Sequence, residues 1–246
     1  MFVHNIDPVF FTIFGLEIRY YGLVYFLGFL FILWFLYRKK DKLGLTKEQV
    51  YDYVFYLIIG SITGSRLFEV LLYNPSYYFS NLSKIIALWE GGMSIHGGIV
   101  GAVLVTYLFS RKHKKDFYKI ADFLVVPLAF FLFLGRIANF INAELIGKIT
   151  NFKYAVKFPD YEGYRHPTQL FEAFKNLVIF FLLLPLKNLK KGVVFYLFLV
   201  LYSFFRFFIE FYKEPVTVYF GVSLGQILCV AFFVIGVYGL YNVNLK

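Results

Sequence analysis

The stretch FLVVPLAFFLFLGRIANFINAELIG, residues 123–147, decides the fold class, because an apolar run leads directly into a group of polar side chains. The run Phe123–Leu134 carries no charge, and Arg136 follows it closely. Residues three apart on a helix share a face, so Arg136, Asn139 and Asn142 form one polar stripe. Charged groups are costly beside hydrocarbon and persist there only when something stabilises them. Two explanations fit this stripe about equally: an anion clamp within a membrane protein, or an interfacial helix end where arginine snorkels and asparagine caps.

The composition places the chain in a membrane. Hydrophobic residues make up 60% of the sequence and charged residues only 16%, whereas a soluble domain is about a quarter charged. Several apolar runs are close to twenty residues long, the length that crosses a bilayer. We therefore expect an all-α polytopic protein that forms one integral membrane domain over 1–246. An aromatic arm at 1–18 is expected on the outer leaflet, and an outer loop region at 141–167.

The apolar runs predict seven transmembrane helices. The third and fifth runs are weaker, because glycines interrupt one and the polar stretch Glu172–Lys175 interrupts the other. The predicted spans are 19–37, 51–72, 94–110, 120–140, 168–186, 193–212 and 223–242.

The basic residues set the expected orientation. The net charge is +10, and lysines and arginines gather between the apolar runs. They form RKKDK at 38–42, RKHKK at 111–115, and a third group of Lys187, Lys190 and Lys191. Under the positive-inside rule these loops are cytoplasmic, which places the N-terminus outside and the C-terminus inside. Because the charge lies in juxtamembrane loops, nucleic acid is not an expected partner.

A histidine lies within a glycine-rich segment, WEGGMSIHGG at 89–98. Gly97 and Gly101 form a small-xxx-small pair that suits close helix packing, as does the GSITG segment at 60–64. Packing explains the glycines but leaves His96 unexplained. A neutral imidazole can accept a proton near physiological pH, so His96 is a candidate functional residue.

Two charged pairs are expected within helices. Tyr202, Arg206 and Glu210 are four residues apart and share one helical face. From spacing alone, Glu210 neutralises Arg206 in a structural pair or orients it towards an anion, with neither favoured. Arg66 can meet Glu69 three residues later, and there a structural pair is the better interpretation.

The segment YRHPTQLFE, residues 164–172, has the character of a helix start on the outer face. Pro167 suits the first turn of a helix, where its missing N–H matters least. Capping accounts for much of this segment, whereas Arg165 and His166 remain unexplained.

The sequence lacks the signatures of common soluble enzymes. It has no P-loop, HExxH, GxSxG or CxxC pattern, and its four histidines are widely separated, so we expect neither a metal site nor a cofactor. Cys229 lies in an apolar helix and is expected to be buried. The predicted topology places several arginines and one histidine in the outer half of the membrane, and arginine's planar fork suits phosphate. Chemistry on a phospholipid headgroup is therefore expected, at Arg66, His96, Arg136, Arg165 and Arg206.

The motifs resemble, in order and over almost the whole chain, those of the prolipoprotein diacylglyceryl transferase family. They are YYGLVY at 20–25, GSRLFEVLLYN at 64–74, WEGGMSIHGG at 89–98, GRIANFINAELIG at 135–147, RHPTQLFE at 165–172 and FRFFIEF at 205–211. The resemblance implies a multi-pass enzyme of the bacterial cytoplasmic (inner) membrane with its active site towards the extracytoplasmic side. It implies transfer of diacylglyceryl from phosphatidylglycerol to the lipobox cysteine of a prolipoprotein signal peptide, which forms a thioether and releases glycerol phosphate.

The resemblance also implies roles for individual residues. Arg136 and Arg206 match the essential arginines and would clamp the phosphate, whereas His96 would act as base or proton acceptor. The family often has tyrosine where this chain has Phe171, and the segment 148–164 is short. Further matching positions are Tyr21, assigned with the catalytic residues, and the expected phosphatidylglycerol contacts Asn139, Glu144, Gly147, Tyr202, Glu210, Arg66 and His166.

Two other classes of function also fit parts of the sequence. A lipid or ion transporter with a charged intramembrane pathway is the main alternative, but transport needs access from both sides and usually inverted repeats. The predicted polar groups favour one leaflet, and no internal repeat is visible. A lipid-binding scaffold without catalytic activity is the third possibility, and it does not explain the presence of His96.

Overall fold

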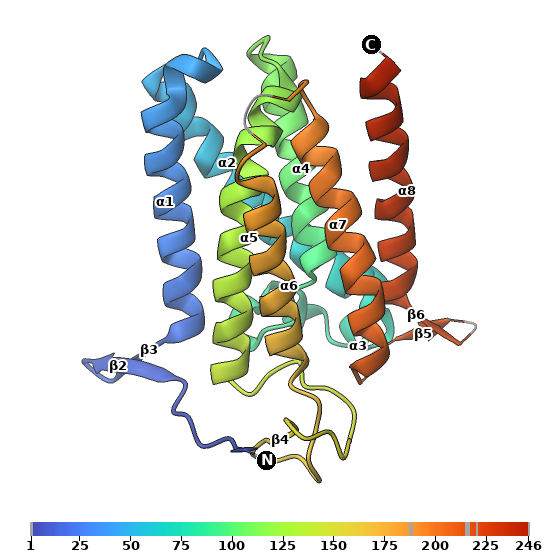
Figure 1. Ribbon diagram of the computed structural model, residues 1–246. Helices are drawn as coiled ribbons and strands as arrows, with labels where there is room; N and C mark the ends of the chain where they lie inside the picture. The colour runs from blue at the N-terminus through green and yellow to red at the C-terminus, as the bar shows by residue number, and fades with distance from the viewer. Residues whose placement is uncertain (1, 187–188, 215–216, 220, 246) are drawn as a thin grey trace. The chain divides into compact units, whose positions relative to one another are not determined.

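The computed structural model describes residues 2–186, 189–214, 217–219 and 221–245, and it is mostly helical (Figure 1). The α-helices are α1 Tyr20–Leu43, α2 Lys47–Phe68, α3 Pro75–Ser80, α4 Ile95–Lys112, α5 Phe117–Ile141, α6 Thr168–Leu183, α7 Val193–Ile209 and α8 Leu224–Leu245. The short turns are the π-helical η1 Glu69–Tyr73 and the 3-10 helices η2 Leu82–Ile86, η3 Leu88–Glu90 and η4 Glu210–Tyr212. The strands are β1 Phe2–Val3, β2 Val9–Ile13, β3 Leu16–Arg19, β4 Val156–Lys157, β5 Val218–Tyr219 and β6 Val222–Ser223.

The chain is a multi-pass membrane protein. In the part of it that the structure describes, five helical segments are long and apolar enough to cross a bilayer: Tyr20–Leu43, Lys47–Tyr73, Phe117–Ile141, Val193–Tyr212 and Leu224–Val243. Helices also occupy the third and fifth predicted spans, as α4 and α6. However, α6 has only 16 residues and contains two charged side chains, and α4 is rich in glycine. Seven spans and their orientation therefore stay predictions.

The chain divides into two compact units. Unit 1 comprises Met1–Gly28, Asp122–Pro215 and Gly221–Lys246, and unit 2 comprises Phe29–Ala121 and Val216–Phe220. Two of the four boundaries fall within helices, one in α1 and one in α5. That the whole chain forms one membrane domain stays a prediction.

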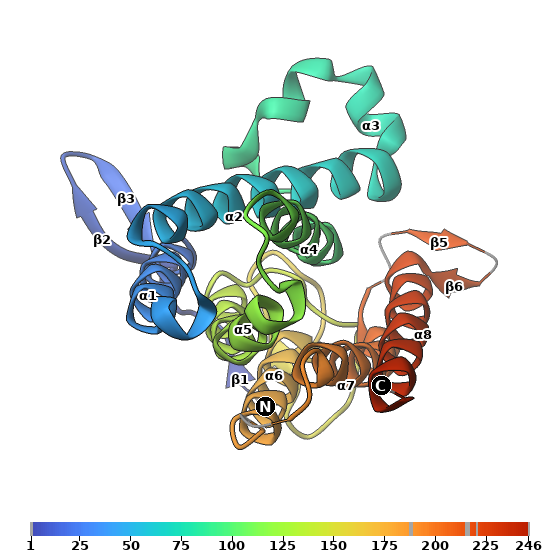
Figure 2. The same ribbon diagram turned by 90° about the horizontal axis from the view of Figure 1, so that it is seen from above.

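Helices α2 and α4 of unit 2 pack against each other (Figure 2), and glycines of both helices form the contact. A Cβ atom added to Gly97 would lie 2.2 Å from the carbonyl oxygen of Gly64, and one added to Gly101 would lie 2.1 Å from that of Gly60. Such distances leave no room for a side chain, so the backbones touch. The predicted small-xxx-small packing is confirmed.

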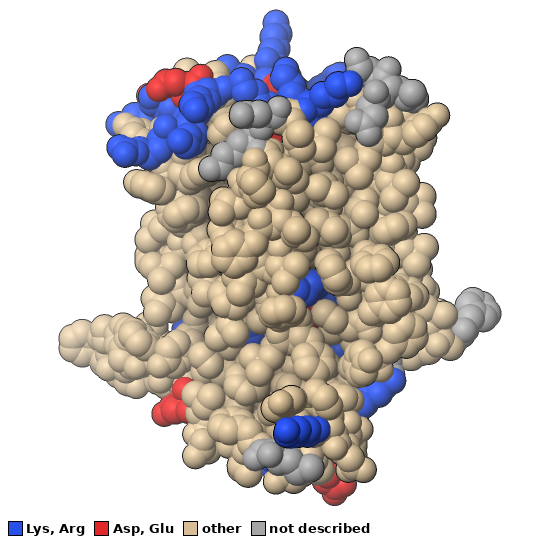
Figure 3. Space-filling model, viewed as in Figure 1, with Lys and Arg blue, Asp and Glu red and all other residues tan. Residues whose placement is uncertain are grey.

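The ends of the unit 2 helices carry basic residues. The last turn of α1 contains Lys40 and Lys42, and that of α4 contains Arg111 and Lys112. Figure 3 shows Lys and Arg side chains crowded at this end, above a surface of other residues. This agrees with the predicted basic groups at 38–42 and 111–115, whereas Lys187 of the third group lies outside the described residues.

Helix α7 of unit 1 packs against both α6 and α8 (Figure 2). Its first turn is capped from another helix, since the Asp122 carboxylate of α5 accepts hydrogen bonds from the backbone N–H groups of Gly192 and Phe195 at 2.6 and 2.7 Å. Helix starts leave such N–H groups without intrahelical partners, and a carboxylate there also suits the helix dipole. Cys229 on α8 is 1% exposed, which confirms its predicted burial.

The N-terminal arm of unit 1 is made of strands. Strand β1 pairs in parallel with β4, and β2 and β3 form an antiparallel hairpin. Phe10, Phe11 and Phe14 on this hairpin are exposed, Phe14 completely. An exposed apolar edge of this kind suits the membrane interface, so the predicted aromatic arm takes the form of a β-hairpin.

Candidate active site

A buried carboxylate surrounded by basic side chains lies within unit 1. Glu172 on α6 is 0% exposed, and four basic side chains pair with it among the described residues. Its Oε2 lies 3.6 Å from Nε of Arg136 and 3.0 Å from Nζ of Lys175, and its Oε1 lies 2.9 Å from Nζ of Lys213 and also pairs with Nη1 of Arg206. Buried charges persist only when paired in this way. We define the cation cluster as Arg136, Glu172, Lys175, Arg206, Glu210 and Lys213.

Helix α7 supplies the predicted pair of Arg206 and Glu210. Nη2 of Arg206 lies 3.0 Å from Oε2 of Glu210, and both side chains are about nine-tenths buried. One turn earlier, the Tyr202 ring lies 3.7 Å from Nζ of Lys175, within the range of a cation–π contact. The ion pair predicted from spacing is therefore confirmed, and the helical face that carries it contacts α6 through Lys175 and Glu172.

The second arginine is held by the last turn of α5 and the loop that follows it. Nη1 of Arg136 donates to Oδ1 of Asn139 at 3.3 Å, and Nδ2 of Asn139 donates to the Glu144 carboxylate at 3.1 Å. Asn142 donates to the other oxygen of Glu144 at 3.2 Å, and Gln169 of α6 donates to the Glu144 backbone carbonyl. The polar stripe seen in the sequence is thus a connected hydrogen-bond network that orients Arg136.

Gly147 joins three segments next to the cation cluster. Its N–H donates to the carbonyl oxygen of His166 at 3.0 Å, and the next N–H, of Lys148, donates to the carbonyl oxygen of Tyr212 at 2.9 Å. A Cβ atom added to Gly147 would lie 2.6 Å from each of those two carbonyl oxygens. Glycine is needed here because the backbones approach closely. The contact places Lys213, which follows Tyr212, beside Glu172.

Tyr21 lies near the start of α1, in the part of that helix belonging to unit 1. Its hydroxyl donates to the hydroxyl of Tyr25 at 3.1 Å. It is also close enough to Arg136 and Glu144 to interact with their charges. Its position is therefore next to the arginine network rather than within the ion pairs.

Arg165 and His166 shape the loop that was predicted to face outward. The His166 ring packs against Phe152, Phe171 and Tyr212, with ring centroids 5.1 to 6.1 Å apart. Burial lowers the pKa of His166, which favours its neutral form. Arg165 donates to the Gly147 carbonyl oxygen and pairs with Glu214 at 2.8 Å. Phe171, where the family often has tyrosine, completes this aromatic packing.

Two predicted site residues, His96 and Arg66, belong to unit 2. His96 at the start of α4 is 1% exposed, and its Nδ1 lies 3.1 Å from the Tyr73 hydroxyl. The Arg66 guanidinium donates to backbone carbonyls between residues 84 and 92, and it lies over the Tyr78 ring. The expected partner Glu69 instead accepts a hydrogen bond from Asn74. These contacts show that Arg66 holds the backbone of residues 84–92, and its role in phosphatidylglycerol binding stays a prediction.

Three residues of the cation cluster were not among the predicted site residues: Glu172, Lys175 and Lys213. The sequence contained a signal for two of them, since Glu172 and Lys175 are charged residues three apart in an otherwise uncharged helix. Lys213 follows Glu210 by three residues but lies beyond the end of α7. Burial, Arg206 and Arg136 lower the pKa of Lys213 well below its usual range, so a further anion beside it would favour its charged form.

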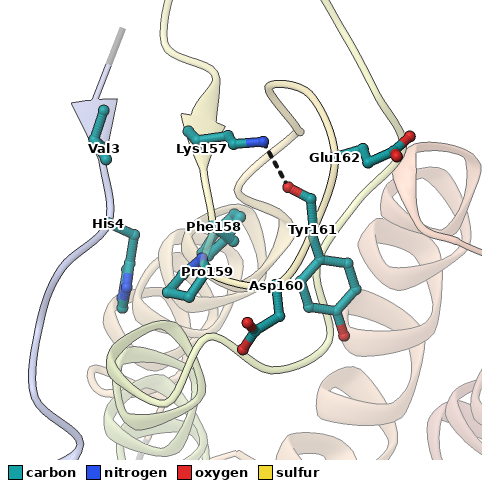
Figure 4. Close-up of a pocket in the computed structure, with 8 residues that line it drawn as sticks. All are labelled: Val3, His4, Lys157, Phe158, Pro159, Asp160, Tyr161 and Glu162. Carbon is teal, nitrogen blue, oxygen red and sulfur yellow. Dashed lines mark hydrogen bonds between the residues drawn. The ribbon is translucent and has the colours of Figure 1, made fainter.

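Unit 1 contains an open cavity of about 480 Å³ between the N-terminal arm and the loop that follows β4. Figure 4 shows its walls, with Nζ of Lys157 donating to the carbonyl oxygen of Tyr161 at 2.7 Å. Within the described chain, no cation-cluster residue lines it. The same residues contain no cluster of three or more His, Cys, Asp or Glu side chains that could hold a metal ion.

The family model and the individual relatives that match this chain agree on one family. The family model for prolipoprotein diacylglyceryl transferase matches residues 8–242. The phosphatidylglycerol–prolipoprotein diacylglyceryl transferases of Rickettsia felis and Rickettsia rickettsii (strain Sheila Smith) are 43% and 44% identical, each over 98% of both chains. That of Rickettsia bellii (strain OSU 85-389) is 41% identical over 95% of this chain and 94% of its own. The chain therefore belongs to the prolipoprotein diacylglyceryl transferase family.

Proposed function

We propose that this chain transfers the diacylglyceryl group of phosphatidylglycerol to the lipobox cysteine of a prolipoprotein signal peptide. The names of its relatives give both substrates, and the chain matches those relatives over nearly its full length. The observation that carries the assignment to a site is the buried cation cluster, in which Arg136 and Arg206 converge on one carboxylate. Convergent arginines suit a phosphate group.

The reaction exchanges one bond for another at a glycerol carbon. The cysteine thiol loses its proton, and its sulfur bonds to the carbon that carries the phosphate ester. The carbon–oxygen bond breaks, and its electron pair leaves on the phosphate oxygen of glycerol phosphate. Negative charge therefore grows on the phosphate, where Arg136 and Arg206 stabilise it more strongly than in the bound substrate.

The remaining residues of unit 1 hold this clamp in place. Asn139 and Glu144 fix the Arg136 guanidinium, and Glu210 fixes that of Arg206. Glu172 keeps all the cations together before phosphate arrives. Tyr202 supports Lys175 through its ring, and Tyr21 completes the wall near Arg136. These positioning roles follow from hydrogen bonds that limit where the arginines can point.

His96 is proposed as the group that receives the thiol proton. A thiol of pKa near 8.5 is mostly protonated at neutral pH, and a neutral imidazole is a suitable acceptor. The Tyr73 hydroxyl, 3.1 Å from Nδ1, fixes the orientation of the ring. A His96→Asn variant whose rate depends on pH as in the wild type would remove His96 as the base.

The proposed setting is the bacterial cytoplasmic (inner) membrane, with seven spans and the site towards the extracytoplasmic side. The basic helix ends of unit 2 support this orientation, because such ends face the cytoplasm. The lipobox cysteine is proposed to meet the lipid on the extracytoplasmic side. A site on that side gives the thiol access to lipid without crossing the bilayer.

The decisive experiment supplies purified protein with phosphatidylglycerol and a lipobox peptide and measures the peptide mass. A diacylglyceryl adduct on the cysteine peptide, absent from its serine analogue, is the expected result. Arg136→Ala and Arg206→Ala should abolish the adduct, whereas Arg111→Ala, at the exposed end of α4, should retain it. Lipid or ion flux through proteoliposomes without any adduct would instead favour a transporter.

A further inference from the structure

The cation cluster carries more positive than negative charge. With both lysines protonated, the state that an anion beside them favours, it contains four cations and two carboxylates within the described residues, an excess of two. Every cation in it is at most 8% exposed, so solvent does little to screen the excess. Glu144, the nearby third carboxylate, is exposed and bonded to asparagine amides, so water screens its charge.

Phosphatidylglycerol supplies only one of the two missing negative charges, because its headgroup is a phosphodiester. A phosphomonoester carries nearly two negative charges at neutral pH. The proposed reaction converts the first kind of group into the second. Thiolate brings one charge and phosphodiester another, and both end on the departing glycerol phosphate. The excess of two positive charges therefore matches the charge of the phosphomonoester product rather than that of the phosphodiester substrate.

We propose that the cation cluster is selective for dianionic phosphomonoesters, so that glycerol phosphate and lipids with a terminal phosphomonoester headgroup compete with the phosphodiester substrate. This inference rests on the proposed function, since that function defines the diester as substrate. The selectivity speeds the chemical step, because it favours the charge that develops in the transition state. It also makes the enzyme sensitive to its own product and to phosphomonoester lipid in the membrane.

Lys175 and Lys213 supply the second of the two excess positive charges of the cation cluster. Each contacts a different oxygen of Glu172, at 3.0 and 2.9 Å, and each is largely buried. The Tyr202 ring holds the Lys175 ammonium at 3.7 Å. Removing one lysine lowers the excess from two charges to one, which a phosphodiester already satisfies. The lysines should therefore set the selectivity between the two ligand types.

The test compares two lipids that differ by one methyl group. Phosphatidic acid is a phosphomonoester, and phosphatidylmethanol with the same acyl chains is the phosphodiester of matched size. Binding to the purified protein in phosphatidylcholine nanodiscs is measured by calorimetry at pH 8. We expect phosphatidic acid to bind at least about tenfold more tightly, which corresponds to one additional charge-assisted hydrogen bond. Equal affinities in the wild type would overturn the proposal.

A second pair of ligands separates the lipid source from the soluble one. Glycerol phosphate is compared with its methyl ester by the same measurement. Selectivity for both phosphomonoesters supports a site open to water and lipid, and selectivity for the lipid alone supports a site reached from the membrane. Either result supports the proposal, whereas equal affinities in the lipid pair contradict it whatever the soluble pair shows.

Variants assign the selectivity to the lysines. Lys175→Met and Lys213→Met should bring the ratio for the lipid pair close to one, and Lys175→Arg and Lys213→Arg should restore it. Lys190→Met, at an exposed position, is the matched control and should leave the ratio unchanged. A wild-type ratio in both Met variants would show that the lysines do not cause the selectivity.

The adduct assay on the same preparations separates this inference from the proposed function. Peptide modification without phosphomonoester selectivity overturns only the inference. Selectivity without peptide modification leaves an anion site in place and overturns the transferase assignment.

Discussion

Nζ of Lys213 lies 2.9 Å from Oε1 of Glu172, which ties the segment after α7 to the buried face of α6. The same carboxylate oxygen pairs with Arg206, one turn before the end of α7. Glu172 therefore fixes both the helix end and the cation beyond it. A carboxylate so enclosed is costly to bury alone, and its partners are costly to bury without it.

Glu172→Gln tests this shared dependence. The amide keeps the size of the side chain but removes its negative charge. The four surrounding cations then repel one another with no carboxylate between them. We expect a loss of about 3–5 kcal/mol in the free energy of unfolding, the range for breaking a buried ion pair. Unfolding in detergent measures it, and added phosphatidylglycerol should restore part of the loss. Glu162→Gln in the exposed loop is the control, and equal stability of the two variants would contradict the role of Glu172.

Gly147→Ala tests the junction that positions Lys213. The new Cβ atom would lie 2.6 Å from the carbonyl oxygens of His166 and Tyr212, so one segment must move. We expect adduct formation to fall at least about tenfold, because displacements near 1 Å are costly at catalytic sites. Gly135→Ala is a matched control in the same sequence block, with nothing within 4 Å of its added Cβ atom. Normal turnover in Gly147→Ala would show that the junction tolerates the shift.

Gly101→Ala tests the backbone contact between α2 and α4. Its Cβ atom would lie 2.1 Å from the Gly60 carbonyl oxygen, so the helices must separate. Overpacking of this kind costs about 1–3 kcal/mol. The control is Gly22→Ala on α1, where space is open and alanine's better helix propensity should slightly stabilise the protein. The measurement is the midpoint of thermal unfolding of each variant, which should be lower for Gly101→Ala than for Gly22→Ala. Equal midpoints would show that the backbone contact at Gly101 does not stabilise the protein.

The helices and their glycine contacts could be predicted from the sequence because they depend on local patterns. Apolar runs give the helices, and four-residue spacing gives the pairs Gly97–Gly101 and Arg206–Glu210. Both patterns act within one helix, where periodicity fixes which side chains share a face. The same reasoning linked Arg136 to Asn139.

The centre of the site could not be predicted in this way, because Glu172 acquires its role from residues far along the chain. In the sequence its one local signal is Lys175 three residues later, which indicates a pair within α6 and gives none of the distant partners. Its partners Arg136, Arg206 and Lys213 come from α5, α7 and the segment after α7. Similarly, nothing local shows that Arg66 meets backbone carbonyls rather than the carboxylate three residues later.

Arg66→Lys separates a structural role of this arginine from a role in phosphate binding. The guanidinium donates to the carbonyl oxygens of Lys84, Ala87 and Gly92, among others, and a lysine ammonium lacks the planar fork that reaches them together. We expect hydrogen exchange across residues 84–92 to accelerate about tenfold or more, because that backbone loses its shared donor. Arg111→Lys at the exposed end of α4 should leave exchange there unchanged. If Arg66→Lys keeps wild-type protection but raises the KM for phosphatidylglycerol, Arg66 contacts the lipid and the structural assignment is wrong.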